Sequence, residues 1–230
     1  RGNDEMFLVT PTKGEPFSVN AGHIFSFYVT PRRKGDYPSY KEMTAREFYM
    51  SCKTNKHICK LQRVGIDIDN DIDLPVDPYV LGAFIGDGCL TKGQASICTP
   101  DIEILDAIAE WADTIDCKLT KRWGGDNKRA WIANVVMKNR SKNKAVLALR
   151  EVGILGCNAY QKYIPGIYKT ASMHNRLNLL AGLIDTDGAK SKGGYDWISA
   201  SEQLADDIVY LCRSVGLAAY KSKCQKGCQN

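Results

Sequence analysis

The chain has 230 residues, of which 44% are hydrophobic and 25% are charged, the ordinary mixture of a globular protein. This composition excludes disorder over the whole chain, and no apolar run approaches the roughly 18 residues that a membrane-spanning helix needs. The polar start does not resemble a secretory signal, which favours a cytoplasmic protein, or a nuclear one in a eukaryote. The nine cysteines include no Cys-x-x-Cys pair, and we expect reduced thiols.

Positive charge is concentrated in one part of the sequence. The formal net charge is +5, yet residues 1–79 contribute none of it, because they hold 11 basic and 11 acidic side chains. Residues 117–144 hold nine basic side chains and one acidic side chain. Such a block favours a polyanionic partner, with a solvated surface as the alternative.

The first part of the chain is expected to be rich in strands. Residues 6–10, 17–19 and 24–29 are β-branched or aromatic runs separated by glycine and proline, which predicts three strands. Thr44 is expected to cap a short helix over 45–50. From Asp67 acidic residues alternate with Ile and Leu until prolines follow, so we expect a linker and a domain boundary near residue 76.

An internal repeat occupies the rest of the sequence. Residues 80–121 align with residues 180–221 without a gap, which indicates two copies of one folding unit. Each copy begins with an apolar helix that ends at Asp-Gly. A strand (95–99 or 195–199) and an amphipathic helix (101–115 or 201–215) are then expected. The first copy should continue with a hairpin (118–123 and 129–137) and a helix over 144–152 that ends at Gly153.

Two glycines inside the apolar helices suggest that these helices touch. Gly82 and Gly182 each cost about 1 kcal/mol relative to Ala in a helix interior, and a close contact between backbones can offset that cost. If the helices pack in parallel, Asp87 and Asp187 meet at their C-terminal ends, where helix carbonyl groups add negative charge. Oxygen ligands select hard cations such as Mg²⁺, and two such ions beside a basic surface suit phosphodiester hydrolysis. The alternative is that Asp-Gly simply ends a core helix.

Residues 180–188 read LAGLIDTDG and resemble the signature of the LAGLIDADG homing endonucleases, from which they differ only at Thr186. The first copy, residues 80–88, is looser but keeps Gly82, Asp87 and Gly88. The resemblance covers about residues 79–221 and implies an α+β fold, a pseudo-two-fold pair of αββαββα units at 77–174 and 175–230. It implies that Asp87 and Asp187 bind the catalytic Mg²⁺ ions, with the carbonyl groups of Gly86 and Thr186 as additional ligands.

In this family two curved sheets straddle the DNA major groove, so the implied partner is double-stranded DNA with a long asymmetric target. The basic hairpin falls where such a sheet is expected. Its lysines and arginines would bind phosphates, and arginine and asparagine could read base edges. Strand alternation does not predict which of them face the DNA; the candidates are Lys118, Arg122, Lys128, Arg129, Asn134 and Lys138.

Two further segments resemble intein-type members. Residues 162–165 read KYIP and match a Lys-x-Ile-Pro motif whose lysine reaches the active site, where Lys162 would orient or activate the attacking water and stabilise charge at phosphorus. A surface lysine before a proline turn is the alternative. Residues 20–23 read NAGH and resemble the intein block with the N-terminal splice-site histidine. Asn20 and His23 are therefore candidate splicing residues, within a partial Hint-type splicing domain at residues 1–76.

The order of these segments resembles the intein of the yeast vacuolar ATPase, with departures. An intein begins with Cys or Ser and ends with His-Asn, whereas this sequence begins with Arg1 and ends with Gln229 and Asn230. The second unit is too short for its last hairpin and helix. We therefore expect a fragment, or a second chain that completes the fold.

The sequence thus predicts a site-specific homing endonuclease embedded in an intein, with no membrane partner. An RNA maturase or a DNA-binding module without cleavage is one alternative, and protein splicing as the main activity is another. A zinc site is a further alternative, although the spacing fits no common finger; its ligands would be Cys52, His57 and Cys59, or Cys224 and Cys228. The remaining cysteines are expected to be core thiols: Cys89, Cys98, Cys117, Cys157 and Cys212.

Overall fold

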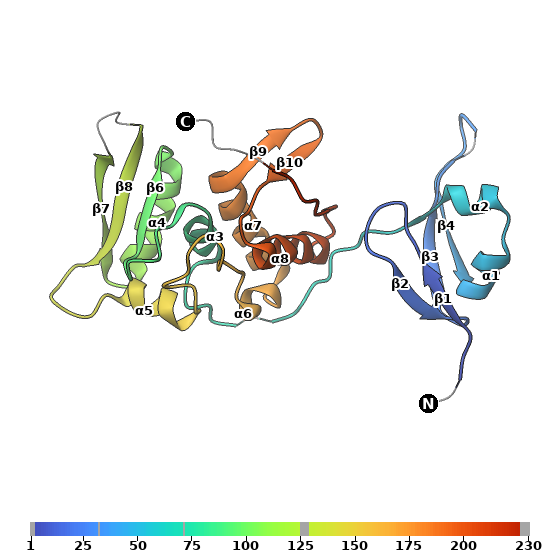
Figure 1. Cartoon of the computed structure of the whole chain (residues 1–230), viewed down its shortest axis with the longest axis horizontal. Coiled ribbons are helices and arrows are strands. Elements are labelled where there is room, and N and C mark those ends of the chain that lie inside the picture. The colour runs from blue at the N-terminus through green and yellow to red at the C-terminus, as the bar shows by residue number, and fades with distance from the viewer. Residues whose placement is uncertain (1–2, 32, 71, 125–128, 226–230) are drawn as a thin grey trace. The chain divides into compact units, whose positions relative to one another are not determined.

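In the computed structural model, which describes residues 3–31, 33–70, 72–124 and 129–225, the chain divides into two units between Val64 and Gly65. Both units combine helices with strands (Figure 1), in agreement with the α+β class. Even α7, the longest helix in the part described, has 15 residues, and no described helix is long and apolar enough to cross a membrane.

The first unit contains the three predicted strands, observed as β1 (Met6–Val9), β2 (Phe17–Asn20) and β3 (Ile24–Val29). β1 pairs with β2, and β3 lies between β4 (Ser39–Thr44) and β5 (Cys59–Leu61), all antiparallel. The predicted helix is α1 (Ala45–Met50), and α2 (Lys53–Ile58) follows it. The core of this unit is formed by Val19, Phe25, Phe27 and Ala45.

Thr44 caps α1 as predicted. Its hydroxyl accepts a hydrogen bond from the Glu47 amide at 3.2 Å, while the Glu47 carboxylate accepts one from the Thr44 amide at 2.7 Å. This reciprocal capping box satisfies amides that the first helical turn leaves without partners. The sequence did not predict β4, β5 or α2, because their polar residues show little periodicity.

The second unit begins with α3 (Pro78–Asp87), followed by β6 (Ser96–Thr99), α4 (Ile102–Thr114), β7 (Cys117–Gly124), β8 (Ala130–Met137) and α5 (Lys144–Glu151). The strand order β6-β8-β7 is antiparallel throughout. Helix α4 packs on this sheet with its buried apolar residues, Ile104, Leu105, Ile108 and Trp111. The predicted hairpin and both helices are confirmed, and the backbone of Gly153 after α5 has the left-handed φ of 82°.

The second half of this unit contains α6 (Gly166–Lys169), α7 (Met173–Asp187), β9 (Gly188–Ser191), β10 (Gly194–Trp197) and α8 (Glu202–Ser214). α3 and α7 both end at an aspartate, and α4 and α8 occupy equivalent positions 100 residues apart. Positive φ angles also recur, at Gly93 and Gly193 and at Asp116 and Gly216. The recurrence supports the internal repeat, whereas the αββαββα layout with a two-fold relation stays a prediction.

The division between the units lies before the predicted boundary near residue 76. The described part of residues 65–76 has no helix or strand but packs within the second unit. The Ile66 amide donates to the Ser214 carbonyl at 2.8 Å, and the Tyr168 hydroxyl donates to the Val76 carbonyl at 2.8 Å. Buried Arg176 also donates to the carbonyl groups of Ile66 and Ser214. These contacts are tertiary, so local composition did not reveal them.

Candidate functional site

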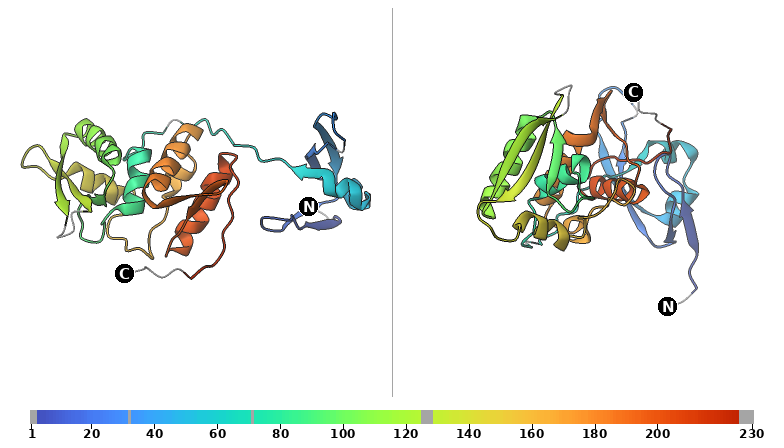
Figure 2. Two further views of the ribbon diagram at one scale, coloured as in Figure 1. Left: turned by 90° about the horizontal axis from the view of Figure 1, so that it is seen from above. Right: turned by 60° about the vertical axis from the view of Figure 1, so that its left-hand side comes forward.

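The candidate site lies at the ends of α3 and α7, which run side by side (Figure 2). Gly82 and Gly182 are buried at their contact. A Cβ atom added to Gly182 would lie 2.9 Å from the Ala83 amide nitrogen and would collide with the Tyr79 carbonyl. A Cβ added to Gly82 would lie 2.9 Å from the Leu183 amide nitrogen. The close approach predicted for these glycines is therefore confirmed, and only glycine fits without backbone movement.

Helices α3 and α7 run parallel, so their C-terminal ends lie next to each other. One turn beyond the glycine contact, Gly86 faces Thr186, whose side chain would collide with an added Cβ. The same Cβ would lie 3.5 Å from Asp187 Oδ2, while the Thr186 hydroxyl donates to the Gly182 carbonyl at 2.9 Å. Asp87 and Asp187, 100 residues apart in the sequence, are thus neighbours.

The two carboxylates share an environment that disfavours charge. Burial and the nearby charge of Asp187 raise the pKa of Asp87 from 3.8 to about 6, against the opposing effect of Lys162. Burial also raises the pKa of Asp187, and Lys162 again opposes the shift. The site therefore holds an excess of negative charge that a cation would neutralise.

Lys162 completes this cluster from a distant part of the sequence. Its Nζ donates a hydrogen bond to the Gly86 carbonyl at 2.5 Å. Burial lowers the pKa of Lys162, while Asp187 and Asp87 act in the opposite direction. The structure brings together all five residues that were assigned to catalysis and metal binding: Gly86, Asp87, Lys162, Thr186 and Asp187.

The donor set fits a hard divalent cation. Two carboxylates and the backbone carbonyl groups of the helix ends supply oxygen atoms only, which is the chemistry that Mg²⁺ prefers. Within residues 3–31, 33–70, 72–124 and 129–225 no three His, Cys, Asp or Glu side chains are grouped to hold a metal. A cation between Asp87 and Asp187 would therefore need backbone or water oxygens as well.

The cysteines differ in part from the expectation. Cys117 is buried and Cys157 and Cys212 are half-buried, but Cys89 and Cys98 are exposed, so the prediction of core thiols was wrong for these two. Cys98 lies on β6 between buried Ile97 and Thr99, so strand alternation directs it away from the core. The alternative zinc ligands Cys52, His57, Cys59 and Cys224 form no cluster of three with other described residues, and Cys228 lies outside them.

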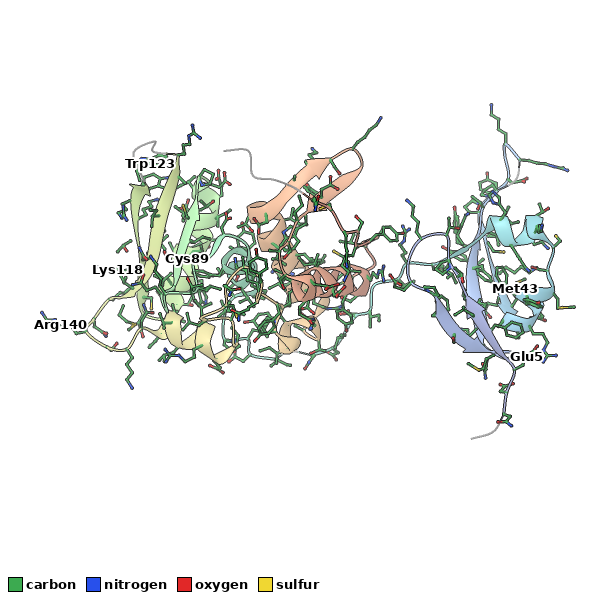
Figure 3. All side chains as sticks on the ribbon, viewed as in Figure 1. Glu5, Met43, Cys89, Lys118, Trp123 and Arg140 are labelled. Atoms are coloured by element: carbon green, nitrogen blue, oxygen red, sulfur yellow. The ribbon has the colours of Figure 1, made fainter. Side chains whose placement is uncertain are left out.

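The register of the basic hairpin decides which candidates share a face. Lys118 pairs with Val136, Thr120 with Asn134, and Arg122 with Ile132. The side chains that alternate with them along β7, such as buried Cys117 and half-buried Leu119, face α4. Lys118, Arg122 and Asn134 therefore lie on the sheet face opposite α4, and Figure 3 shows Lys118 near the start of β7. We call this surface the open face of the sheet.

The other DNA-binding candidates lie elsewhere. Lys138 forms an ion pair with Asp113 of α4 at 2.9 Å. Arg129 is exposed just before β8, and Lys128 lies outside the described residues. The sequence analysis missed a stacked aromatic pair on the α4 face, Trp123 and Trp131, whose ring centroids are 4.2 Å apart, with Lys121 Nζ 5.2 Å from the Trp131 ring.

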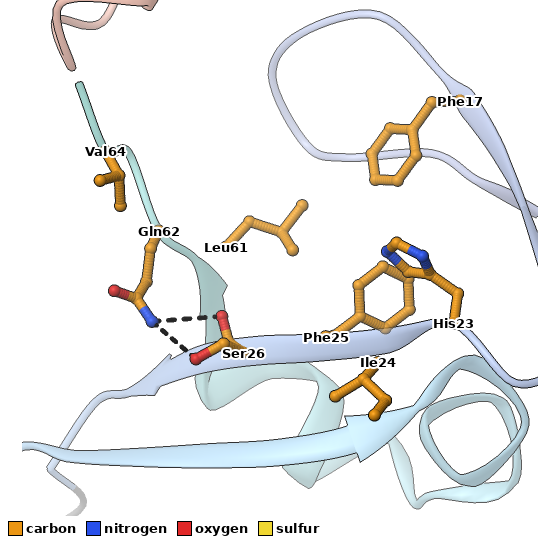
Figure 4. A pocket seen from close by; sticks show the side chains of 8 residues that line it. All are labelled: Phe17, His23, Ile24, Phe25, Ser26, Leu61, Gln62 and Val64. Carbon is orange, nitrogen blue, oxygen red and sulfur yellow. Dashed lines mark hydrogen bonds between the residues drawn. The ribbon is translucent and has the colours of Figure 1, made fainter. Parts of the chain in front are cut away.

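The splicing candidates Asn20 and His23 lie at the turn between β2 and β3 of the first unit, and His23 borders the hollow that is drawn in Figure 4. The His23 amide donates to the Asn20 carbonyl at 3.2 Å between β2 and β3. The His23 ring packs edge-to-face on Phe25 at 5.1 Å, and Gln62 Nε2 donates to Ser26 Oγ at 2.9 Å nearby. Together they border an open hollow that is lined by Phe17, His23, Ile24, Phe25, Ser26, Leu61, Gln62 and Val64.

Comparison with known proteins finds similarity to a helicase and to a homing endonuclease. A protein of Mycobacterium intracellulare named replicative DNA helicase DnaB is 32% identical over 151 residues, which are 63% of this chain and 21% of that protein. The chain thus spans about one fifth of the length of this curated relative. A solved structure of mesophilic variants of the homing endonuclease I-DmoI resembles 60% of this chain and 75% of that chain, with a TM-score of 0.40 and 15% identity. No family model matches the chain.

Proposed function

We propose that this chain is a site-specific DNA endonuclease of the LAGLIDADG type, which hydrolyses phosphodiesters at the paired ends of α3 and α7. One observation carries the proposal: the glycine contact between these helices makes neighbours of Asp87 and Asp187, and Lys162 joins them from a separate loop. A role in ending the helix would be enough to explain a single Asp-Gly pair at a helix end. It does not explain two neighbouring carboxylates of like charge beside a half-buried lysine.

Each residue of the site has a role in the proposed reaction. Asp87 and Asp187 would hold divalent ions, with the carbonyl oxygens of Gly86 and Thr186 as further ligands. When bound, Mg²⁺ would supply positive charge at the scissile phosphate and a more acidic bound water. Lys162 Nζ, fixed at the Gly86 carbonyl, would orient the attacking water and counter the negative charge that develops at phosphorus.

The open face of the sheet is the proposed DNA contact. The exposed side chains of Lys118 and Arg122 would bind phosphates, and Asn134 between them could read a base edge. Ile132 and Val136 share this face and offer apolar contact to thymine methyl groups. Arg129, which is exposed just before β8, would add a phosphate contact, and Lys138 and Lys128 stay further candidates.

The proposal extends to an intein context. The chain matches about one fifth of a protein named a DNA helicase, and an intervening sequence within such a host would give a match of this kind. His23 at the β2–β3 turn, beside an open hollow, is accessible to a peptide bond that must be polarised.

The intein context is tested in the full reading frame. His23→Ala should slow thiol-induced cleavage at the upstream splice junction. Exposed His57 on α2 provides the control His57→Ala, which should leave this cleavage unchanged.

The endonuclease function is tested with a pool of randomised DNA duplexes. The protein is incubated with the pool and Mg²⁺, and the new ends are sequenced. We expect cut ends at one long, asymmetric sequence, dependent on Mg²⁺ and suppressed by a chelator. Cutting that is unchanged by the chelator, or no cutting with Mg²⁺ or Mn²⁺ although the pool is bound, would contradict the proposal.

A further inference from the structure

The loop that carries Lys162 is fixed by a helix of the other repeat copy. Ser201 Oγ donates a hydrogen bond to the Lys162 carbonyl at 2.7 Å. Asp207 Oδ2 accepts one from the Ile164 amide at 2.9 Å. Ser201 is the N-cap of α8, and Asp207 lies on that helix. The loop is therefore held at two points, at Lys162 itself and two residues beyond it.

Asp207 is an unusual residue for its position. Its side chain is only 5% exposed, and burial of a carboxylate is costly unless its partners compensate. These partners are the Ile164 amide, Lys169 Nζ at 2.7 Å and Gln203 Nε2 at 3.0 Å. Two of the three belong to residues 162–169. Asp207 thus gains most of its stabilising contacts from the segment that follows Lys162.

The internal repeat shows that this carboxylate is not required by the helix itself. The equivalent position on α4, 100 residues earlier, is Ala107, which is half-buried. α4 packs instead on the strands β6, β7 and β8. The copy whose helix contacts the Lys162 loop is the copy that carries the buried carboxylate.

We propose that Ser201 and Asp207 are positioning residues that hold Lys162 Nζ at the Gly86 carbonyl, beside Asp87 and Asp187. The inference rests on the proposed endonuclease function and adds a second contribution of the C-terminal repeat copy to the site. Both residues act through Lys162, so their removal should lower the rate of cleavage without loss of DNA affinity. A displacement of about 1 Å at such a site can lower the rate about a hundredfold.

The test compares Asp207→Asn and Ser201→Ala with two matched controls. Asp206→Asn changes the adjacent aspartate, which is exposed and pairs with Lys221, and Ser201→Thr keeps the hydroxyl. Single-turnover cleavage should fall about tenfold or more in the first two variants, while their DNA dissociation constants stay at the wild-type value. Both controls should cleave at the wild-type rate. Wild-type cleavage by both Asp207→Asn and Ser201→Ala would overturn the inference.

A double-mutant comparison separates positioning from general loss of stability. In a Lys162→Met background, Asp207→Asn should cause no further loss of rate, because its effect passes through Lys162. A structural role alone would instead lower the rate by the same factor in both backgrounds, and that result contradicts the inference. If Asp207→Asn does not fold, Ser201→Ala provides the same comparison.

A readout that needs no cleavage keeps this inference distinct from the proposed function. Lys162 reactivity toward an amine-specific acylating reagent is measured by mass spectrometry in the absence of DNA. Labelling of Lys162 should increase severalfold in Asp207→Asn and Ser201→Ala and stay unchanged in Asp206→Asn. If wild-type protein cuts no DNA while this pattern holds, only the proposed function fails. If the protein cuts DNA while Lys162 labelling stays unchanged in both variants, the positioning inference fails.

Discussion

Asp87 carries a carboxylate whose surroundings oppose its charge. Its pKa is raised from 3.8 to about 6, first by burial and then by Asp187. The folded protein therefore binds this proton more tightly than the unfolded chain does. It follows that ionisation of Asp87 lowers the stability of the fold as the pH rises from about 4 to about 6, and the full penalty is present at neutral pH.

Replacement of this carboxylate should stabilise the protein without metal. Asp87→Asn should raise the melting temperature at neutral pH by about 2–4 °C, which corresponds to about 1 kcal/mol after allowance for solvent screening. The difference from the wild type should shrink toward about pH 5, where the wild-type carboxyl becomes protonated. Exposed Asp106 on α4 provides the matched control Asp106→Asn. A lower melting temperature of Asp87→Asn at neutral pH contradicts this account of the site.

Divalent cations should act on the same residues with the opposite sign. Mg²⁺ should raise the melting temperature of the wild type, because a ligand that binds only the folded state stabilises it by mass action. Asp87→Asn and Asp187→Asn should lose this increase, and NaCl of equal ionic strength should not reproduce it. An equal increase in all three proteins would show that Mg²⁺ binds elsewhere.

The residues of the site were predictable where a motif carried them. Asp87, Asp187 and Lys162 lie in short segments that the sequence singles out, and the fold brings them together. Ser201 and Asp207 were missed, because each holds the Lys162 loop through a backbone group about 40 residues away, a contact that no spacing rule identifies. One signal was present: Asp207 stands on the apolar stripe of α8, between buried Leu204 and Leu211.

The contact between α3 and α7 is the element on which the site depends, because it sets the separation of the two aspartates. It is formed by backbone atoms on both sides of Gly82 and Gly182. A side chain at either position cannot be accommodated by rotamer changes. Substitution of either glycine therefore has two opposing effects on the stability of the protein. Higher helix propensity raises the stability, and the disturbed packing lowers it.

Gly182→Ala should destabilise the protein. Helix propensity alone would stabilise it by about 1 kcal/mol, but an added methyl group at this closed contact should cost about 1–3 kcal/mol or more. The free energy of unfolding should fall, and DNA cleavage with it. Gly166→Ala on α6 is the matched control, because an added Cβ there meets no atom within 4 Å. A more stable Gly182→Ala with normal cleavage would refute the helix contact.

The open face of the sheet should contribute to DNA affinity through charge. Lys118→Gln with Arg122→Gln should weaken binding to all sequences and lower the slope of log affinity against log salt by about 0.9 for each phosphate that the double variant no longer neutralises. Lys144→Gln is the control, because this lysine lies on α5 and pairs with Asp116. An unchanged slope in the double variant would show that this face does not meet the DNA.

Elements were predictable to the extent that their periodicity was clear. The amphipathic helices α4 and α8 and the hairpin of β7 and β8 were predicted nearly to their ends. The sequence did not predict which face of the hairpin lies against α4, because apolar residues occur on both faces of β8. Ile132 and Val136 lie on the open face, and Ala133 and Val135 lie inside. Only the observed register resolves that ambiguity.

At the scale of the whole chain, the two units differ in their relation to the site. All residues of the proposed catalytic cluster belong to residues 65–230, and the splicing candidates belong to residues 1–64. The sequence predicted two parts with a boundary near residue 76, whereas the contacts divide the chain between Val64 and Gly65. It could not show that Val76 is buried and bonded to Tyr168, or that Arg176 binds the Ile66 carbonyl.

Two truncations test where the second unit begins. A fragment of residues 65–230 should fold cooperatively and bind DNA as the whole chain does. A fragment of residues 77–230 should be less stable by several kcal/mol, because it loses buried Val76, leaves the Tyr168 hydroxyl without its backbone partners and removes the Ile66 carbonyl from buried Arg176. Equal denaturant midpoints for the two fragments would mean that residues 65–76 are only a linker.

The carboxylate pair at the end of α3 and α7 is tested most directly by single-turnover cleavage of a selected DNA target with Asp87→Asn and Asp187→Asn. Both variants keep the size of the side chain and remove one charge. We predict that each abolishes Mg²⁺-dependent cleavage while DNA binding is kept or becomes tighter, since a negative charge near phosphate is removed. Full Mg²⁺-dependent cleavage by either variant would contradict the account.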